Sequence, residues 1–140
     1  MGSIFRTANA AGITKIILSG YTPTPLDRFN QPRKDFAKVS LGAEKTITWS
    51  HVKTVGPTLA RLKKEGVHVI AIEQDKRAVS LFEYHLAEKN VAIVLGNEVR
   101  GISKNILSKC DIVLEIPMHG TKESLNVSVA AGIALFTLIR

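Results

Sequence analysis

Apolar residues along the chain form short runs that alternate with segments of mixed polarity. Four runs rich in aliphatic residues are typical of strands buried on both faces of a sheet. They cover residues 15–19, 67–73, 91–95 and 111–116. A shorter stretch at residues 46–49 predicts a further strand.

The segments between these runs carry apolar residues three or four positions apart, which is the spacing of one helix face. They predict helices at residues 3–11, 35–41, 57–65 and 103–109, and one helical turn at residues 80–83. Ser3 and Ser103 stand at the positions of helix N-caps. Gly12 and Gly66 follow the ends of two helices, where a left-handed residue commonly stands.

The last predicted helix, residues 124–139, is apolar on nearly every side after its first turn. Such a helix is buried in a core or against a partner. It is too short and too polar at its start to cross a bilayer, which needs about 20 apolar residues. Ser124 is its predicted N-cap. Ser124 and Asn126 therefore place polar groups at the start of an apolar helix, a suitable position for a binding site.

Strands that alternate with helices predict one α/β domain, with a parallel sheet covered by helices on both faces. Ligands of such sheets bind beyond the carboxyl ends of the strands. Two of these ends carry distinctive loops, at residues 95–98 and 116–118.

The composition favours a polyanionic partner. The 140 residues carry a formal net charge of +7, and nucleic acid is the commonest partner of such a basic chain. The alternative is a basic protein that binds no polyanion. Cys110 is the only cysteine, which excludes an internal disulfide and a cysteine-based zinc site and fits the reducing cytoplasm. The first residues show no secretion signal, so we expect a cytoplasmic protein without membrane attachment.

The loop at residues 27–34 combines positive charge with an aromatic side chain. Arg28, Arg33 and Lys34 could contact phosphates while Phe29 stacks on a base. The alternative is a solvated connection between two elements.

The turn at residues 96–101 is similar to two nucleotide-binding motifs and matches neither. Glu98 replaces the second glycine of a dinucleotide-binding turn, and Ile102 replaces the lysine of a phosphate-binding P-loop. The four histidines lack the spacing of metal ligands, so no metal is expected.

Three stretches together resemble the SpoU group of RNA ribose 2′-O-methyltransferases, in the SPOUT superfamily. They are residues 2–8, residues 93–102, and residues 116–118 with 124–130. Each alone is weak, but their order and spacing are specific and span nearly the whole chain. The resemblance implies a C-terminal trefoil knot, a bound S-adenosyl-L-methionine, a homodimer, and tRNA or rRNA as the substrate.

The resemblance also implies site residues. The cofactor-binding positions are Leu95, Gly96, Asn97, Gly101, Ile116, Met118, Ser124 and Leu125. The catalytic positions are Arg6, Glu98, Ser124 and Asn126. A guanidinium almost never deprotonates, so we expect Arg6 to hold a phosphate and stabilise oxyanion charge rather than act as the base. By composition alone, Arg6 would be a solvated helix charge.

One departure from the family pattern concerns the start of the chain. The first motif usually has an asparagine two residues before its glycine, whereas only Met1 precedes Gly2. We therefore expect either an N-terminally truncated methyltransferase or a catalytically inactive RNA-binding relative. A third alternative is an α/β protein that binds a small molecule, for which RNA affinity would be absent or insensitive to salt.

Overall fold

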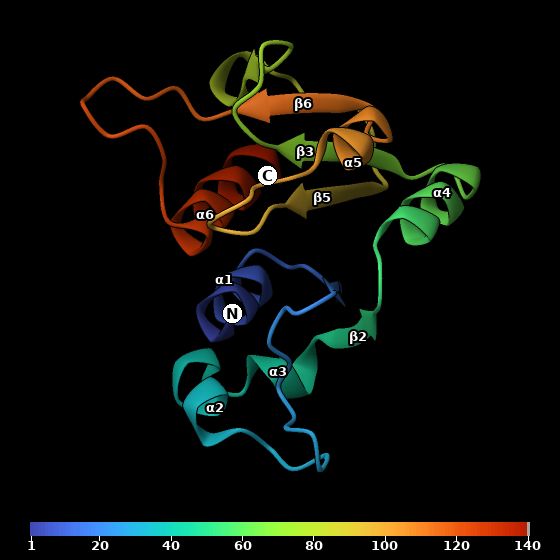
Figure 1. Cartoon of the computed structure of the whole chain (residues 1–140), viewed down its shortest axis with the longest axis vertical. Coiled ribbons are helices and arrows are strands. Elements are labelled where there is room, and N and C mark those ends of the chain that lie inside the picture. The colour runs from blue at the N-terminus through green and yellow to red at the C-terminus, as the bar shows by residue number, and fades with distance from the viewer. Residues whose placement is uncertain (140) are drawn as a thin grey trace. The chain divides into compact units, whose positions relative to one another are not determined.

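The computed structural model describes residues 1–139 and divides the chain into two compact units, Met1–Thr54 and Val55–Arg140. Each unit has its own sheet, and every paired strand in both sheets runs parallel (Figure 1). The prediction of an α/β chain with parallel strands is confirmed, although the strands form two sheets. Whether both units belong to one functional domain stays a prediction.

The first unit packs three helices around a two-stranded sheet. Its elements are α1 Gly2–Ala10, β1 Lys15–Ser19, α2 Lys34–Ser40, α3 Ala43–Thr46 and β2 Thr48–Val52. The core contains Phe5 of α1, Leu18 of β1 and Phe36 of α2, all buried. The rings of Phe5 and Phe36 meet edge to face at 5.1 Å between centroids, a favoured aromatic geometry.

One prediction for this unit is wrong, and another has the right element with shifted bounds. Helix α1 begins at Gly2 with Met1 as its N-cap, and no side chain caps it, so Ser3 is not the cap. The strand predicted at residues 46–49 is displaced, because the single turn α3 occupies the chain up to Thr46. Leu41 and Gly42 both have positive φ and turn the chain from α2 into α3. A four-residue helix is too short to show a hydrophobic period.

Gly2 has a packing role that explains the glycine of the first SpoU-like stretch. A Cβ at this position would lie 2.8 Å from the Phe36 carbonyl oxygen and 3.1 Å from Val39 Cβ. The missing side chain therefore lets α1 approach α2 closely.

The second unit holds a four-stranded parallel sheet in the order β4-β6-β3-β5. Its elements are α4 Gly56–Lys64, β3 His68–Ile72, β4 Val79–Ser80, η1 Leu81–Glu83, β5 Val91–Leu95, α5 Lys104–Ser108, β6 Ile112–Glu115 and α6 Val127–Leu138. Ser103 caps α5 by accepting from Ile106 N, and Gly66, at φ +82°, follows α4, as predicted.

Helices cover both faces of this sheet. Ile70, Ile72 and Leu114 pack with the apolar face of α6. Their neighbours Ala71 and Val113 point to the opposite face and pack against Leu107 of α5. Successive strand residues point to opposite faces, so each strand contributes to two cores and must be apolar throughout.

The prediction that Ser124 caps the last helix is wrong. Helix α6 begins at Val127, and Asn126 Oδ1 accepts from the Ser128 backbone N at 2.8 Å. Asn and Ser are equally good N-caps, so residue type does not decide between Ser124 and Asn126. The cap is the residue directly before the first helical residue, and here that residue is Asn126. Ser124 lies two residues further out and is exposed.

Asp111 ties the amino ends of β3 and β6 together. Its Oδ2 accepts from Val69 N at 2.8 Å, and its Oδ1 lies 3.4 Å from Lys63 Nζ. The hydrogen bond from Val69, followed by the nearby Lys63 charge, holds the pKa of this carboxyl below its usual value of 3.8.

We expect Asp111→Ala to lower the free energy of unfolding by about 1 kcal/mol at neutral pH, the usual contribution of one such hydrogen bond. Because the pKa is lowered in the folded state, the stabilisation is complete above pH 3.8 and is lost as the pH falls through the folded-state pKa. Denaturant unfolding of both proteins at pH 7 and below pH 3.8 measures this. If the two proteins differ in free energy of unfolding by the same amount at both pH values, the stabilisation does not come from the ionised Asp111 carboxylate.

Candidate functional site

In the second unit, strands β3, β5 and β6 end at the same height in the sheet, so their carboxyl ends form one edge. The register places Leu95 of β5 and Leu114 of β6 on either side of Ile72 of β3. Two strand spacings of about 4.8 Å separate β5 from β6. The loops that follow these strands, predicted from the sequence as site loops, therefore start about 10 Å apart at the same edge.

The loop after β5 is a tight turn held by the Asn97 side chain and by a backbone hydrogen bond. Asn97 Oδ1 accepts from Val99 N at 2.7 Å and Arg100 N at 3.2 Å, and Gly101 N donates to Asn97 O at 2.8 Å. A Cβ at Gly96 would lie 2.6 Å from the Gly101 carbonyl carbon and 2.7 Å from Ile102 N. Gly96 is thus required by the close return of the chain, and the Asn97 side chain has a structural role in the turn.

A carboxylate from the neighbouring strand supports this turn. Glu73 directly follows β3, and its Oε2 accepts from Ile102 N at 2.8 Å. Glu73 was not predicted as a site residue from the sequence. The available signal was an acidic residue directly after a buried strand, at the edge where ligands bind.

The segment between β6 and α6 completes the edge. Figure 1 shows it running out beyond the arrowheads of β3, β5 and β6 before it turns back into α6. Ile116 and Met118, at its start, are half-buried. Ser124, Leu125 and Asn126, at its end, are exposed, and Leu125 keeps 39% of its surface accessible.

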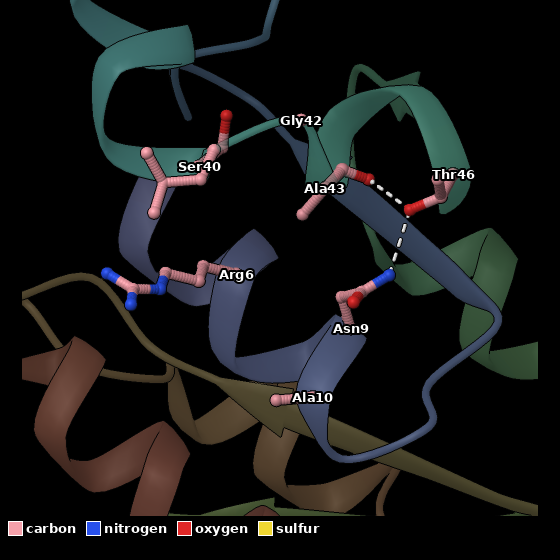
Figure 2. A pocket seen from close by; sticks show the side chains of 8 residues that line it. Arg6, Asn9, Ala10, Ser40, Gly42, Ala43 and Thr46 are labelled. Atoms are coloured by element: carbon pink, nitrogen blue, oxygen red, sulfur yellow. Dashed lines mark hydrogen bonds between the residues drawn. The ribbon is translucent and has the colours of Figure 1, made fainter.

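Arg6 lies in the first unit, on the exposed side of α1. It lines an open pocket of about 360 Å³ together with Asn9, Ala10, Thr46 and residues 40–43 (Figure 2). Asn9 Nδ2 donates to Thr46 Oγ1 at 2.8 Å and thereby links α1 to α3. Within residues 1–139, the Arg6 guanidinium has no hydrogen-bond or ion-pair partner, so its charge is available to a ligand.

The predicted catalytic residues are divided between the two units. Arg6 belongs to the first unit, whereas Glu98, Ser124 and Asn126 belong to the second. Glu98 is exposed in the turn after β5. Asn126 uses its Oδ1 to cap α6, which leaves its amide hydrogens for another partner.

The basic loop before α2 is folded rather than extended. Asp27 Oδ1 accepts from Phe29 N at 2.8 Å and from Gln31 N at 3.0 Å. This turn presents the Phe29 ring, 68% exposed, with the Arg28 guanidinium carbon 4.9 Å from its centroid. Arg33 instead pairs with Asp35 at 2.7 Å and, by this hydrogen bond, lowers the pKa of that carboxyl.

Residues 1–139 contain neither a metal-binding cluster nor a membrane-spanning helix. No group of three or more histidine, cysteine, aspartate or glutamate side chains in this range could hold a metal ion. No helix in the same range is long and apolar enough to cross a membrane.

The sequence profile of the SpoU rRNA Methylase family matches residues 1–136, nearly the whole chain. The chain belongs to the SpoU rRNA Methylase family. The SpoU relatives with curated descriptions include the 23S rRNA (guanosine-2′-O-)-methyltransferases RlmB of Xylella fastidiosa, strain 9a5c, and Acinetobacter baylyi. Each is 36% identical to this chain, and each alignment covers 100% of it. The aligned part is 53% of the Xylella protein and 54% of the Acinetobacter protein. The chain thus spans about half the length of these relatives.

Solved SpoU-type structures share the fold. The AdoMet-bound rRNA methyltransferase from Sinorhizobium meliloti has a TM-score of 0.84 and 28% identity, with 97% of this chain and 49% of that chain covered. The A. aeolicus TrmH/SpoU tRNA modifying enzyme has a TM-score of 0.81 and 28% identity, over 97% of this chain and 65% of that chain.

The three SpoU-like stretches of the sequence occupy distinct places in the structure. The first lies in α1, the second comprises the end of β5 and its turn, and the third runs from the end of β6 into α6. Two of the three therefore meet at the carboxyl edge of the four-stranded sheet.

Proposed function

We propose that this chain transfers a methyl group from S-adenosylmethionine to a ribose 2′-hydroxyl of tRNA or rRNA. The observation that carries the proposal is the carboxyl edge of the second unit. There the glycine-dependent turn after β5 and the half-buried segment after β6 start at the same level. We treat both units as one methyltransferase domain that acts in the cytoplasm.

The residues at this edge fit the cofactor. Leu95, Ile116 and Met118 offer half-buried apolar surface for an adenine ring. Gly96 permits the close return of the turn and Gly101 the approach of Glu73, so both glycines shape the turn whose backbone would contact the cofactor. The backbone of Leu125 would offer a further contact. S-adenosylmethionine, when bound, supplies a sulfonium methyl group that a ribose oxygen can attack.

The proposal includes a trefoil knot formed by the C-terminal part of the chain. The long segment between β6 and α6 and the similarity to the A. aeolicus TrmH/SpoU structure support it. Knots are almost absent from proteins in general, so the hydrophobic pattern alone gives no reason to expect one.

Arg6 and the polar residues of the second unit would act on the RNA. A guanidinium is a permanent cation with five N–H donors, which suits the phosphate beside the target ribose and the charge that develops on its 2′-oxygen. Glu98, Ser124 and Asn126 would orient the ribose by hydrogen bonds. The 2′-hydroxyl proton must leave as the new bond forms, and a carboxylate such as Glu98 can accept it whereas Arg6 cannot.

The loop around Phe29 is the proposed RNA contact outside the catalytic centre. Arg28 and Lys34 have exposed side chains for phosphates, whereas Arg33 already pairs with Asp35. The exposed Phe29 ring can stack on an unpaired base.

We expect Phe29→Ala to weaken RNA binding by about 5- to 100-fold with an unchanged salt dependence, because base stacking contributes about 1–3 kcal/mol. Arg28→Ala should instead reduce the slope of log K against log salt concentration by about one unit. Fluorescence anisotropy with labelled single-stranded RNA at several salt concentrations separates the two effects. Phe82→Ala is the control, since Phe82 is similarly exposed in the second unit. Equal weakening by both phenylalanine variants would contradict a specific stacking site.

A homodimer forms the last part of the proposal. Val129 and Phe136 lie seven residues apart on one face of α6 and keep 50% and 55% of their surface exposed. Such an apolar stripe is suited to a second copy of the helix.

Sedimentation at micromolar concentration is expected to show a dimer for the chain. Phe136→Glu should yield a monomer, because a buried unpaired carboxylate opposes association. Phe82→Glu should remain dimeric. A monomeric wild-type chain would contradict the proposed assembly.

The enzymatic proposal is tested by incubating the chain with RNA and S-adenosylmethionine carrying a labelled methyl group, followed by nucleoside analysis. The expected product is a 2′-O-methylribonucleoside. Cofactor binding without transfer would instead favour an inactive RNA-binding relative, and RNA affinity that is absent or insensitive to salt would favour a small-molecule-binding protein.

A further inference from the structure

We propose that Glu73 is a positioning residue that holds the turn at residues 96–102 in the conformation that binds the methyl donor. This role rests on the proposed function, because it concerns the same cofactor site.

Each oxygen of the Glu73 carboxylate accepts one backbone hydrogen bond. Oε2 accepts from Ile102 N at 2.8 Å, across 29 positions of sequence, and Oε1 accepts from the adjacent Gln74 N at 3.0 Å. Hydrogen bonds to a carboxylate are about twice as strong as those between neutral groups. The local bond fixes the direction of the side chain, and the long-range bond connects the end of β3 to the turn after β5.

The turn is shaped to receive this carboxylate. Gly101 has φ +65°, and a Cβ there would lie 2.5 Å from Glu73 Oε2. The carboxylate thus occupies the space that a side chain at position 101 would fill. Gly101 was predicted as a cofactor-binding position, and the structure adds a second reason for a glycine there.

Asn97 and Glu73 hold opposite ends of the turn. Asn97 Oδ1 binds Val99 N and Arg100 N within the turn itself, which closes the turn without placing it relative to the sheet. Glu73 belongs to the neighbouring strand end, so its bond to Ile102 fixes the turn against the sheet edge. A displacement of about 1 Å in a binding turn can cost about a hundredfold in reaction rate.

The nearby Asp75 provides a matched comparison. It also follows β3, and its Oδ1 accepts from Arg77 N at 2.9 Å and from Arg77 Nε at 3.2 Å. These hydrogen bonds stay within two residues, and the charge interaction of Asp75 with Lys104 reaches the start of α5 rather than the turn at residues 96–102. Loss of Asp75 should therefore remove a local hydrogen bond without affecting the cofactor.

The experiment measures binding of S-adenosylhomocysteine by calorimetry and hydrogen exchange of the turn amides for wild type, Glu73→Ala, Glu73→Gln and Asp75→Ala. We expect Glu73→Ala to raise Kd about tenfold or more and to speed exchange at Ile102, because a charge-assisted bond is lost. Glu73→Gln should show a smaller increase in both, since an amide oxygen is the weaker acceptor. Asp75→Ala should match wild type.

A kinetic readout separates positioning from general stability. Glu73→Ala should raise KM for S-adenosylmethionine and leave KM for RNA unchanged, a split that partial unfolding would not produce. If Glu73→Ala fails to fold, the test uses Glu73→Gln. A Glu73→Gln variant with the Kd and the Ile102 exchange rate of wild type would overturn the proposal.

The outcomes distinguish the two proposals. If wild type and Glu73→Ala bind S-adenosylhomocysteine with equal Kd, the role of Glu73 is overturned and the proposed function is not. A wild-type chain that binds none would overturn the proposed function and this role with it.

Discussion

Replacing Arg6 by alanine is expected to lower kcat for RNA methylation by about 10²- to 10³-fold, the usual effect of removing one donor to a developing oxyanion. The guanidinium is exposed and has no hydrogen-bond or ion-pair partner within residues 1–139, so the fold does not depend on it. The melting temperature should therefore stay close to that of wild type. Steady-state kinetics with labelled S-adenosylmethionine and thermal unfolding test both parts.

Two further variants define the role of this arginine. Arg6→Lys keeps the charge but loses the planar fork of donors, so it should recover only part of the activity. Arg61→Ala removes an exposed helical arginine from the second unit and should leave kcat unchanged. An Arg6→Ala variant with wild-type kcat would show that the residue is a solvated helix charge.

Replacing Gly96 by alanine is expected to raise the Kd for S-adenosylhomocysteine about tenfold or more, because the displaced turn loses backbone hydrogen bonds to the ligand that contribute about 0.5–1.5 kcal/mol each. The added Cβ would lie 2.6 Å from the Gly101 carbonyl carbon and 2.7 Å from Ile102 N. Both neighbours are backbone atoms, so no side-chain rotation relieves the contact and the turn must move. Calorimetry with S-adenosylhomocysteine measures the loss.

Gly56→Ala is the matched control for Gly96→Ala. Gly56 also lies in the second unit, but the atom nearest to its added Cβ is Lys109 Nζ at 3.0 Å, the end of a flexible side chain. This variant should bind S-adenosylhomocysteine as wild type does. Wild-type affinity in Gly96→Ala would mean that the turn after β5 does not contact the cofactor.

The sequence predicts the architecture of the second unit well because its strands are buried on both faces. Ile70 and Ala71 contact opposite helices, so β3 had to be an uninterrupted apolar run. Helix ends with local signals were also predictable, as at Ser103 and Gly66. These features depend on residues close together in the chain.

Features that depend on distant contacts were not predictable. The start of α6 was misplaced because Ser124 and Asn126 are equally good caps, and only the packing of α6 decides between them. The contact of Glu73 with Ile102 spans 29 positions, so the acidic residue after the strand is visible in the sequence but its partner is not. The catalytic assignments of Arg6 and Glu98 came from the family resemblance, since neither side chain makes a hydrogen bond or ion pair within residues 1–139 that reveals a role.

The central claim is that the carboxyl edge of the four-stranded sheet is the methyl-donor site. A crystal structure of the chain with S-adenosylhomocysteine tests it most directly. We expect the ligand to lie between the turn after Leu95 and the segment after Ile116, with the C-terminal part of the chain threaded as a knot around it. A ligand bound at any other edge, or a C-terminal helix that lies outside an unthreaded chain, would show that this edge is not the methyl-donor site.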